Sequence, residues 1–132
     1  MRNFTIQELT ASTTAAAKRI NNDPTPEVLE NLKQLINNVL DPLRDAYGKP
    51  IQVNSGYRSP ALNTAVKGSK TSQHVKGQAA DITGGNKQEN KKLFELAQKL
   101  NLPFCQLIDE MGFTWVHISY DKDNVKRQIL HL

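Results

Sequence analysis

The chain has 132 residues, of which 38% are hydrophobic and 23% are charged, a composition typical of one globular domain with a single core. It has no run of about 18 apolar residues, which excludes a transmembrane helix, and its single cysteine excludes an internal disulfide. The net charge of +4 comes from scattered basic residues, a distribution that does not favour nucleic-acid binding. We therefore predict one domain over residues 1–132, acting as a monomer away from membranes and nucleic acids.

The N-terminal half is predicted to be mainly helical. Residues 6–20, with an alanine-rich centre, predict one short helix. The clearest helix spans residues 25–47, where Thr25 is a suitable N-cap and Pro26 takes the first helical position. Pro42 is expected to bend its last turns. Apolar residues recur along this helix at three- and four-residue steps and predict a stripe facing the core, formed by Val28, Leu29, Leu32, Leu35, Ile36, Val39, Leu40 and Leu43.

The C-terminal half is predicted to form mostly short strands. Alternating apolar residues bounded by turn residues predict strands at 51–54, 78–83, 104–108, 115–119 and 128–132, with helices at 60–66 and 87–100. Since helices come first and strands follow, we predict an α+β protein with a small, largely antiparallel sheet and helices on one face.

A histidine and an aspartate lie close together around the start of the strand 78–83. His74 ends a polar loop, Gly77 allows a sharp backbone turn, and Asp81 lies between apolar neighbours in the strand. A carboxylate in such a strand costs free energy unless it is paired or bound to a cation, and imidazole and carboxylate are both good zinc ligands. The alternative is that His74 is a solvated loop residue and that Asp81 caps a turn or pairs with a lysine.

The strand 115–119 carries a second histidine. Alternation places Val116 and Ile118 on the core face, so His117 points to the opposite face together with Trp115. That orientation suits a cleft, and an ordinary surface histidine would give the same pattern.

Other reactive side chains have simpler interpretations. Cys105 is expected to be a buried thiol, as free cysteines often are, and its alternative role as a nucleophile paired with His117 needs an accessible thiolate. Asp109 and Glu110 stand together at a hairpin end, where exposed turn acids are common. His131, next to the C-terminus, is expected to take no part in chemistry.

Three motifs occur in a fixed order. They are Ser55-Gly56-Tyr57-Arg58-Ser59-Pro60, then Ser72-x-His74-x-x-Gly77-x-Ala79-x-Asp81, then Trp115-Val116-His117-Ile118-Ser119. Together they resemble the zinc D-Ala-D-Ala carboxypeptidase family (peptidase family M15), most closely its short single-domain branch from phages and prophages. One motif alone is weak evidence, but three in this order are specific.

The resemblance implies an α+β fold shared with the hedgehog signalling domain. It also implies one Zn²⁺ per chain, with His74, Asp81 and His117 as ligands by motif position.

The resemblance extends to the residues that handle substrate. Arg58 corresponds to the arginine that stabilises charge on the attacked carbonyl, and Ser72 to a serine that contacts substrate. We expect Tyr57, Gln106 and Trp115 to help bind the peptide.

One position departs from the family pattern. Many relatives have an acidic general base three residues before the second histidine ligand, where this chain has Thr114. Threonine cannot accept a proton from water at neutral pH, so we expect Glu110 to replace it. The short branch carries Gln-Leu-Ile-x-Glu at this point, which matches residues 106–110. Asp109 lies on the same face of the strand as the core residue Leu107 and is therefore the weaker alternative, unless a β-bulge moves it to the other face.

The expected function is zinc-dependent hydrolysis of peptide bonds in peptidoglycan stem peptides, by a D-Ala-D-Ala carboxypeptidase or an endolysin-type endopeptidase. The alternative, motivated by Thr114, is an inactive zinc-containing module that binds the cell wall or belongs to a phage particle. A domain without metal would require all three motifs to be accidental.

The N-terminus lacks the apolar segment of a secretory signal. We expect the protein in the host cytoplasm, with release to the cell wall by a phage-type route that needs no signal.

Overall fold

Five strands form one sheet in the computed structural model of the chain, which describes residues 2–132. They are β1 (Gln52–Ser55), β2 (Ala79–Thr83), β3 (Gln106–Glu110), β4 (Trp115–Ser119) and β5 (Gln128–His131). The strand order is β1-β2-β4-β3-β5, and all neighbours are antiparallel except β3 and β5, which run parallel. The prediction of a largely antiparallel sheet is confirmed.

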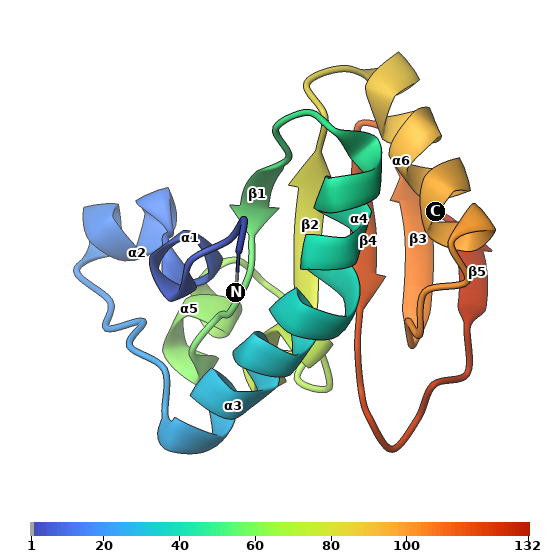
Figure 1. Cartoon of the computed structure of the whole chain (residues 1–132). Helices are drawn as coiled ribbons and strands as arrows, with labels where there is room; N and C mark the ends of the chain where they lie inside the picture. The colour runs from blue at the N-terminus through green and yellow to red at the C-terminus, as the bar shows by residue number, and fades with distance from the viewer. Residues whose placement is uncertain (1) are drawn as a thin grey trace.

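Helical segments fall into a long and a short group. The long group consists of one continuous helical stretch, made of α3 (Pro26–Leu35), η1 (Ile36–Leu40) and α4 (Asp41–Tyr47), and of α6 (Lys87–Lys99), which lies beside it. These helices cover one face of the sheet (Figure 1). The short segments are α1 (Ile6–Thr10), α2 (Thr13–Lys18), α5 (Pro60–Ala65) and η2 (Gln73–Lys76). Of these, α1, α2 and α5 gather beside the edge strand β1 (Figure 1).

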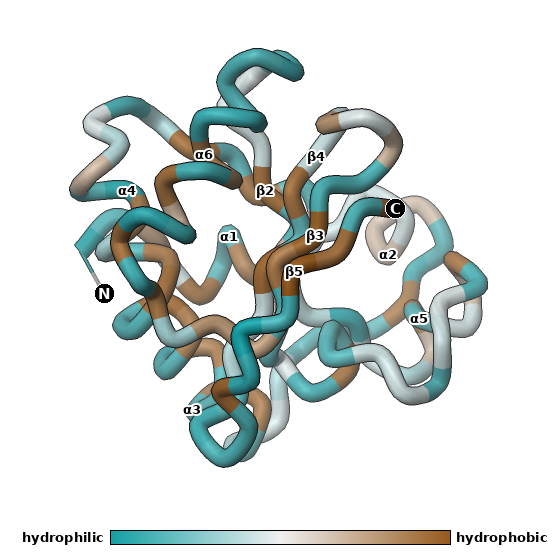
Figure 2. The backbone as a smooth tube through the Cα atoms, turned by 90° about the vertical axis from the view of Figure 1, so that its right-hand side faces the viewer, coloured by the Kyte–Doolittle hydropathy of each residue, from teal (hydrophilic) through white to brown (hydrophobic). Residues whose placement is uncertain are grey.

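The core lies between the sheet and the long helices. Hydrophobic residues are concentrated along the central strands (Figure 2), and Leu32, Leu35, Ile82, Leu107 and Ile118 are fully buried there. The α+β class is therefore confirmed. Within residues 2–132, no helix is both long enough and apolar enough to cross a membrane.

The predicted helix 25–47 contains a π-helical turn. Thr25 caps its start, accepting a hydrogen bond from Val28 N–H at 3.2 Å. Further along, Pro42 has no N–H to give to the carbonyl four residues earlier, and the N–H of Asp41 bonds to the carbonyl of Ile36, five residues back. The expected disturbance at Pro42 is thus a widened turn just before it.

The prediction of one helix over residues 6–20 is wrong, because the structure has two short helices there. Ala11 is extended at the end of α1. Ser12 then caps α2, with its hydroxyl accepting a hydrogen bond from Ala15 N–H at 3.1 Å. A serine at this point competes with the helix backbone and starts a new helix instead.

The strand predicted at 104–108 is shifted by two residues. β3 runs to Glu110 because Leu107 pairs with Ile118 and Asp109 with Val116. Asp109 and Glu110 therefore belong to the strand, and the hairpin turn follows them. The turn places Met111, Gly112 and Phe113 at positive φ.

Candidate metal centre

His74, Asp81 and His117 meet at one point on the sheet face opposite the long helices. One ligand atom from each lies within 4.8 Å of the others. Asp81 and His117 are direct register partners in β2 and β4, and Asp81 Oδ1 lies 3.0 Å from His117 Nδ1. His74 approaches from η2, with Nε2 at 3.4 Å from the same oxygen.

The His74 ring is held in one orientation. Its side chain is buried, and Nδ1 lies 2.6 Å from the carbonyl oxygen of Gly56. Since a carbonyl only accepts, Nδ1 donates its proton to Gly56, and Nε2 is the ring nitrogen that faces Asp81. Ser72 caps η2 by accepting a hydrogen bond from His74 N–H at 3.2 Å. Metal-binding histidines are usually oriented in this way by a carbonyl or carboxylate.

The Asp81 carboxylate is stabilised in its charged form. Burial raises the pKa of Asp81, but hydrogen bonds and positive charge from His117 and His74 outweigh it, and the pKa lies well below its usual range. The cluster therefore offers a charged oxygen and two imidazole nitrogens, which is a donor set suited to zinc.

The spacing of these atoms also fits zinc. Ligand atoms about 2.0–2.2 Å from a tetrahedral ion lie roughly 3.3–3.6 Å from one another. The oxygen of Asp81 lies 3.4 Å from His74 Nε2 and 3.0 Å from His117 Nδ1, so a small adjustment would admit the ion.

Glu110 lies on the same face as the cluster. Ile108 pairs with His117, and Glu110, two residues on, pairs with Trp115. The indole N–H of Trp115 donates to Glu110 Oε2 at 2.6 Å, which fixes one carboxylate oxygen.

Thr114, at the usual position of the base, and Asp109, the alternative to Glu110, are both engaged elsewhere. Thr114 is exposed, and its hydroxyl donates to the carbonyl of Met111 at 2.6 Å within the hairpin turn. Asp109 is buried on the helix-covered face and accepts a hydrogen bond from His131 Nδ1. Neither side chain approaches His117 in these contacts.

Arg58 brings a positive charge to the cluster. Burial lowers the pKa of Arg58, while the negative charges of Asp81 and Glu110 raise it in part, and guanidinium stays protonated throughout. Arg58 Nη2 donates a long hydrogen bond of 3.4 Å to Ser72 Oγ. Its Nε is buried without a hydrogen-bond partner among residues 2–132.

The other predicted substrate residues occupy varied positions. Tyr57 is only 4% exposed and packs into the core, and burial raises its pKa. Gln106 donates to Gln128 Oε1 at 2.9 Å, at the start of β3. Cys105 is buried, as predicted.

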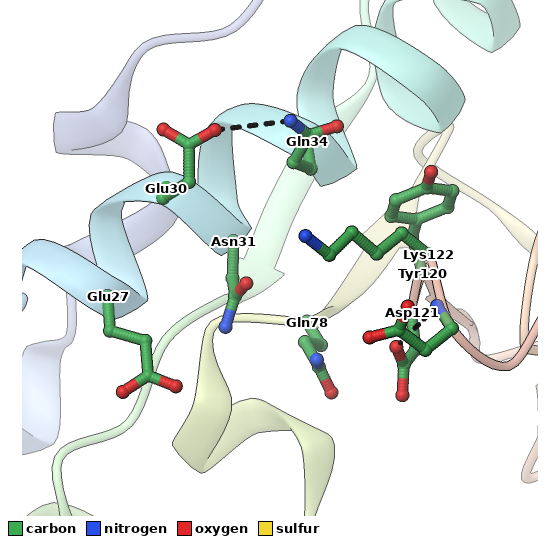
Figure 3. Close-up of a pocket in the computed structure, with 9 residues that line it drawn as sticks. Glu27, Glu30, Asn31, Gln34, Gln78, Tyr120, Asp121 and Lys122 are labelled. Carbon is green, nitrogen blue, oxygen red and sulfur yellow. Dashed lines mark hydrogen bonds between the residues drawn. The ribbon is translucent and has the colours of Figure 1, made fainter.

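A separate pocket of about 390 Å³ lies between α3 and the segment after β4 (Figure 3). Its charged groups are Glu27, Glu30, Asp121, Asp123 and one cation, Lys122. None of the predicted site residues lines this acidic pocket, and the metal chemistry does not use it.

Asn22 has a structural role beside the site that no sequence motif indicated. Its amide nitrogen donates to the carbonyls of Thr10 and Tyr57 at 2.8 and 3.0 Å, and its oxygen accepts from Ser59 N–H at 2.7 Å. Asn22 thus ties the N-terminal segment to both neighbours of Arg58. Only a tendency of asparagine to bond backbone groups could have suggested this.

The α+β fold, with two histidines and an aspartate at zinc-ligand spacing beside its sheet, defines a class of zinc-binding proteins. Residues 2–119 match the Peptidase M15 family. The chain therefore belongs to that family, as the three motifs predicted.

One characterised relative is the zinc D-Ala-D-Ala carboxypeptidase of Streptomyces albus G. The two are 46% identical over 48 residues, which are 36% of this chain and 19% of the relative. The chain thus matches about a fifth of that relative's length.

Proposed function

We propose that this protein hydrolyses a peptide bond in the stem peptides of peptidoglycan, with one zinc ion bound by His74, Asp81 and His117. The observation that carries the proposal is the convergence of these three side chains within 4.8 Å in a chain of the Peptidase M15 family. The name of the Streptomyces relative supports the substrate class.

The chain's own groups would hold the metal ligands rigidly. The carbonyl of Gly56 orients His74, and the register of β2 and β4 sets Asp81 beside His117. Bound zinc would supply Lewis-acid chemistry, activating water and polarising the peptide carbonyl.

Glu110 would act as the general base and then as the general acid. It would accept a proton from the attacking water and pass it to the leaving amine. The hydrogen bond from Trp115 occupies Oε2, so Oε1 remains to exchange the proton. Trp115 would thus position the base as well as contact the peptide.

Arg58 would stabilise the negative charge that develops on the carbonyl oxygen. Its guanidinium interacts with Asp81 and Glu110 at the cluster, and removing one donor to a developing oxyanion typically costs about 10²–10³ in rate. Ser72 accepts from Arg58 and caps η2, so it would position the arginine and His74 together. Tyr57 would support this loop from the core.

A second candidate function is a zinc-containing module that binds the cell wall without cleaving it. Thr114, where many relatives have the acidic base, is the feature that favours it. This protein would bind zinc and peptidoglycan but release no amino groups.

Hydrolysis of purified peptidoglycan separates the two candidates. We expect the zinc-loaded protein to release free amino groups, and we expect a chelator to stop the release and added zinc to restore it. The Glu110→Gln variant should keep its zinc and lose the activity. Zinc binding without release of amino groups by the wild type would support the binding module.

A further inference from the structure

The hairpin of β3 and β4 carries both Glu110 and the metal ligand His117, and its turn has an unfavourable backbone. The three consecutive residues 111–113 all take positive φ, and only the middle one is a glycine. Residues with a side chain avoid this region of the backbone map. Contacts from outside the hairpin are therefore expected to stabilise the turn.

The side chain of Asn90 in α6 supplies such contacts. It is only 1% exposed, and its Nδ2 donates to the carbonyls of Phe113 and Thr114 at 2.8 and 3.1 Å. Its Oδ1 accepts from the hydroxyl of Thr83 at 3.0 Å and from the N–H of Gly84 at 2.7 Å. The one amide thus makes four hydrogen bonds, which is its full capacity.

Asn90 joins β2 to β4 at the point where their backbone pairing ends. The last paired residues at this end are Ile82 and Val116, and in the same register Gly84 lies opposite Thr114. The amide of Asn90 accepts from the first and donates to the second, as a backbone peptide group would. It therefore fixes the hairpin to the strand that carries a metal ligand.

A second contact from α6 acts on the same turn. The ring of Phe94 packs edge to face against that of Phe113, with 5.5 Å between the ring centroids. Since Asn90 and Phe94 are four residues apart, they lie on one face of the helix. The turn is thus attached to α6 by hydrogen bonds and by an aromatic contact.

We propose that Asn90 is a positioning residue for hydrolysis, which acts through the hairpin on the base Glu110. The inference rests on the proposed function, where Glu110 exchanges the proton. The path is short, because Asn90 fixes the carbonyl of Thr114 and the next residue, Trp115, gives its indole N–H to Glu110. Movement of the turn would turn the Glu110 carboxylate away from the attacking water.

The competing explanation is that Asn90 only stabilises the fold. Its loss would leave buried carbonyls unpaired, which destabilises a protein whatever its activity. A purely structural role would lower the unfolding temperature and leave the folded enzyme unchanged. The experiment therefore has to measure the folded protein, at a temperature where circular dichroism shows every variant to be folded.

Fluorescence reports on the hairpin directly, because Trp115 is the one tryptophan of the chain. We expect Asn90→Ala to shift its emission to longer wavelength, as a loosened hairpin admits water to the indole. Glu110→Ala removes the acceptor of the indole N–H and shows the emission of a Trp115 that is not held. The matched control is Tyr47→Phe, which removes the hydroxyl that donates to Glu89 and keeps every hydrogen bond of Asn90.

Steady-state kinetics on a soluble stem peptide supply the second measurement. We expect Asn90→Ala to lower kcat about 10-fold or more, because misplacing a catalytic group slows the chemical step. KM and zinc content should stay within about twofold, and Tyr47→Phe should keep the wild-type kcat. Asn90→Ser, which leaves room for a water beside the carbonyls, is the second variant if Asn90→Ala does not fold.

The outcomes separate the positioning role from the proposed function. Wild-type emission or wild-type kcat in the folded Asn90 variant, or an equal loss of kcat in Tyr47→Phe, would overturn the positioning role and leave the proposed function standing. Absence of hydrolysis by the zinc-loaded wild type would overturn both.

Discussion

Two clusters of carboxylate and imidazole lie on opposite faces of the same sheet. On the open face, Asp81 contacts two histidines, with Arg58 and Glu110 nearby. On the helix-covered face, Asp109 contacts His131 alone, whose ring lies 5.7 Å from that of Phe94 in α6.

The two clusters share a chemistry and differ in what surrounds them. A zinc ion needs three or four protein ligands, and only the Asp81 cluster offers three. The Asp109 cluster instead joins β5 to β3, since the N–H of Leu132 also donates to the Asp109 carbonyl at 2.9 Å. The comparison indicates that ligand number, rather than the presence of an Asp–His pair, separates a metal site from a structural contact.

The largest contrast is expected from replacing one histidine in each cluster. His74→Ala should reduce peptidoglycan hydrolysis by about 10³-fold or more, because water without the metal has a pKa near 15.7 instead of about 7. His131→Ala should leave the specific activity within about twofold, since it touches no reacting group. Release of amino groups at equal concentrations of folded protein measures both, and equal losses would remove the distinction.

The next contrast concerns the neighbouring acids of β3. Glu110→Gln should lower kcat about 10²–10⁴-fold, the usual contribution of a general base, with zinc retained. Asp109→Asn should leave kcat nearly unchanged because its side chain faces the helices. Steady-state kinetics with metal analysis checks this pair, and the reverse ranking would assign the base to Asp109.

A smaller effect is expected on stability at the C-terminal strand. His131→Ala removes the imidazole donor of Asp109, and because the His131 side chain is 70% exposed, so that water can partly replace it, the change should cost about 0.5–1 kcal/mol of unfolding free energy. Urea denaturation should show a lower midpoint with the same slope. An unchanged midpoint would mean that β5 contributes little to the stability of the sheet.

The smallest effect concerns a third carboxylate, which has no imidazole partner. Glu89 joins α6 to α4 by accepting hydrogen bonds from Lys49, Tyr47 and Lys92, and these lower its pKa to about 2. A lowered pKa means that Glu89 stabilises the fold above its unfolded value, about 4.5, and that this is lost as pH falls toward 2. Glu89→Gln should therefore be less stable than wild type at pH 6, with the gap closing between pH 4.5 and 2. A gap independent of pH would contradict this.

Local patterns predicted much of this molecule. Apolar spacing located the helices at 25–47 and 87–100, and alternation located β4 and the face that His117 takes. The same alternation predicted that Glu110 and Asp109 face opposite sides of the sheet, and their hydrogen bonds to Trp115 and His131 confirm it. These features depend on neighbours within a few residues, so the sequence contains their cause.

Features that depend on distant contacts were missed. The break between α1 and α2 accompanies a hydrogen bond from the N–H of Tyr57 to the carbonyl of Leu9. The parallel pairing of β5 with β3 places His131 beside Asp109. The break has a weak local signal in the Ser12 N-cap, whereas the pairing of β5 has none, because it depends on segments far apart in the chain.

We expect the Asp81 cluster to bind zinc and the Asp109 cluster to bind none. The most direct test is the zinc content per chain of the purified wild type, Asp81→Asn and Asp109→Asn. We expect about one zinc in the wild type and in Asp109→Asn, and almost none in Asp81→Asn. No zinc in the wild type, or full zinc in Asp81→Asn, would contradict it.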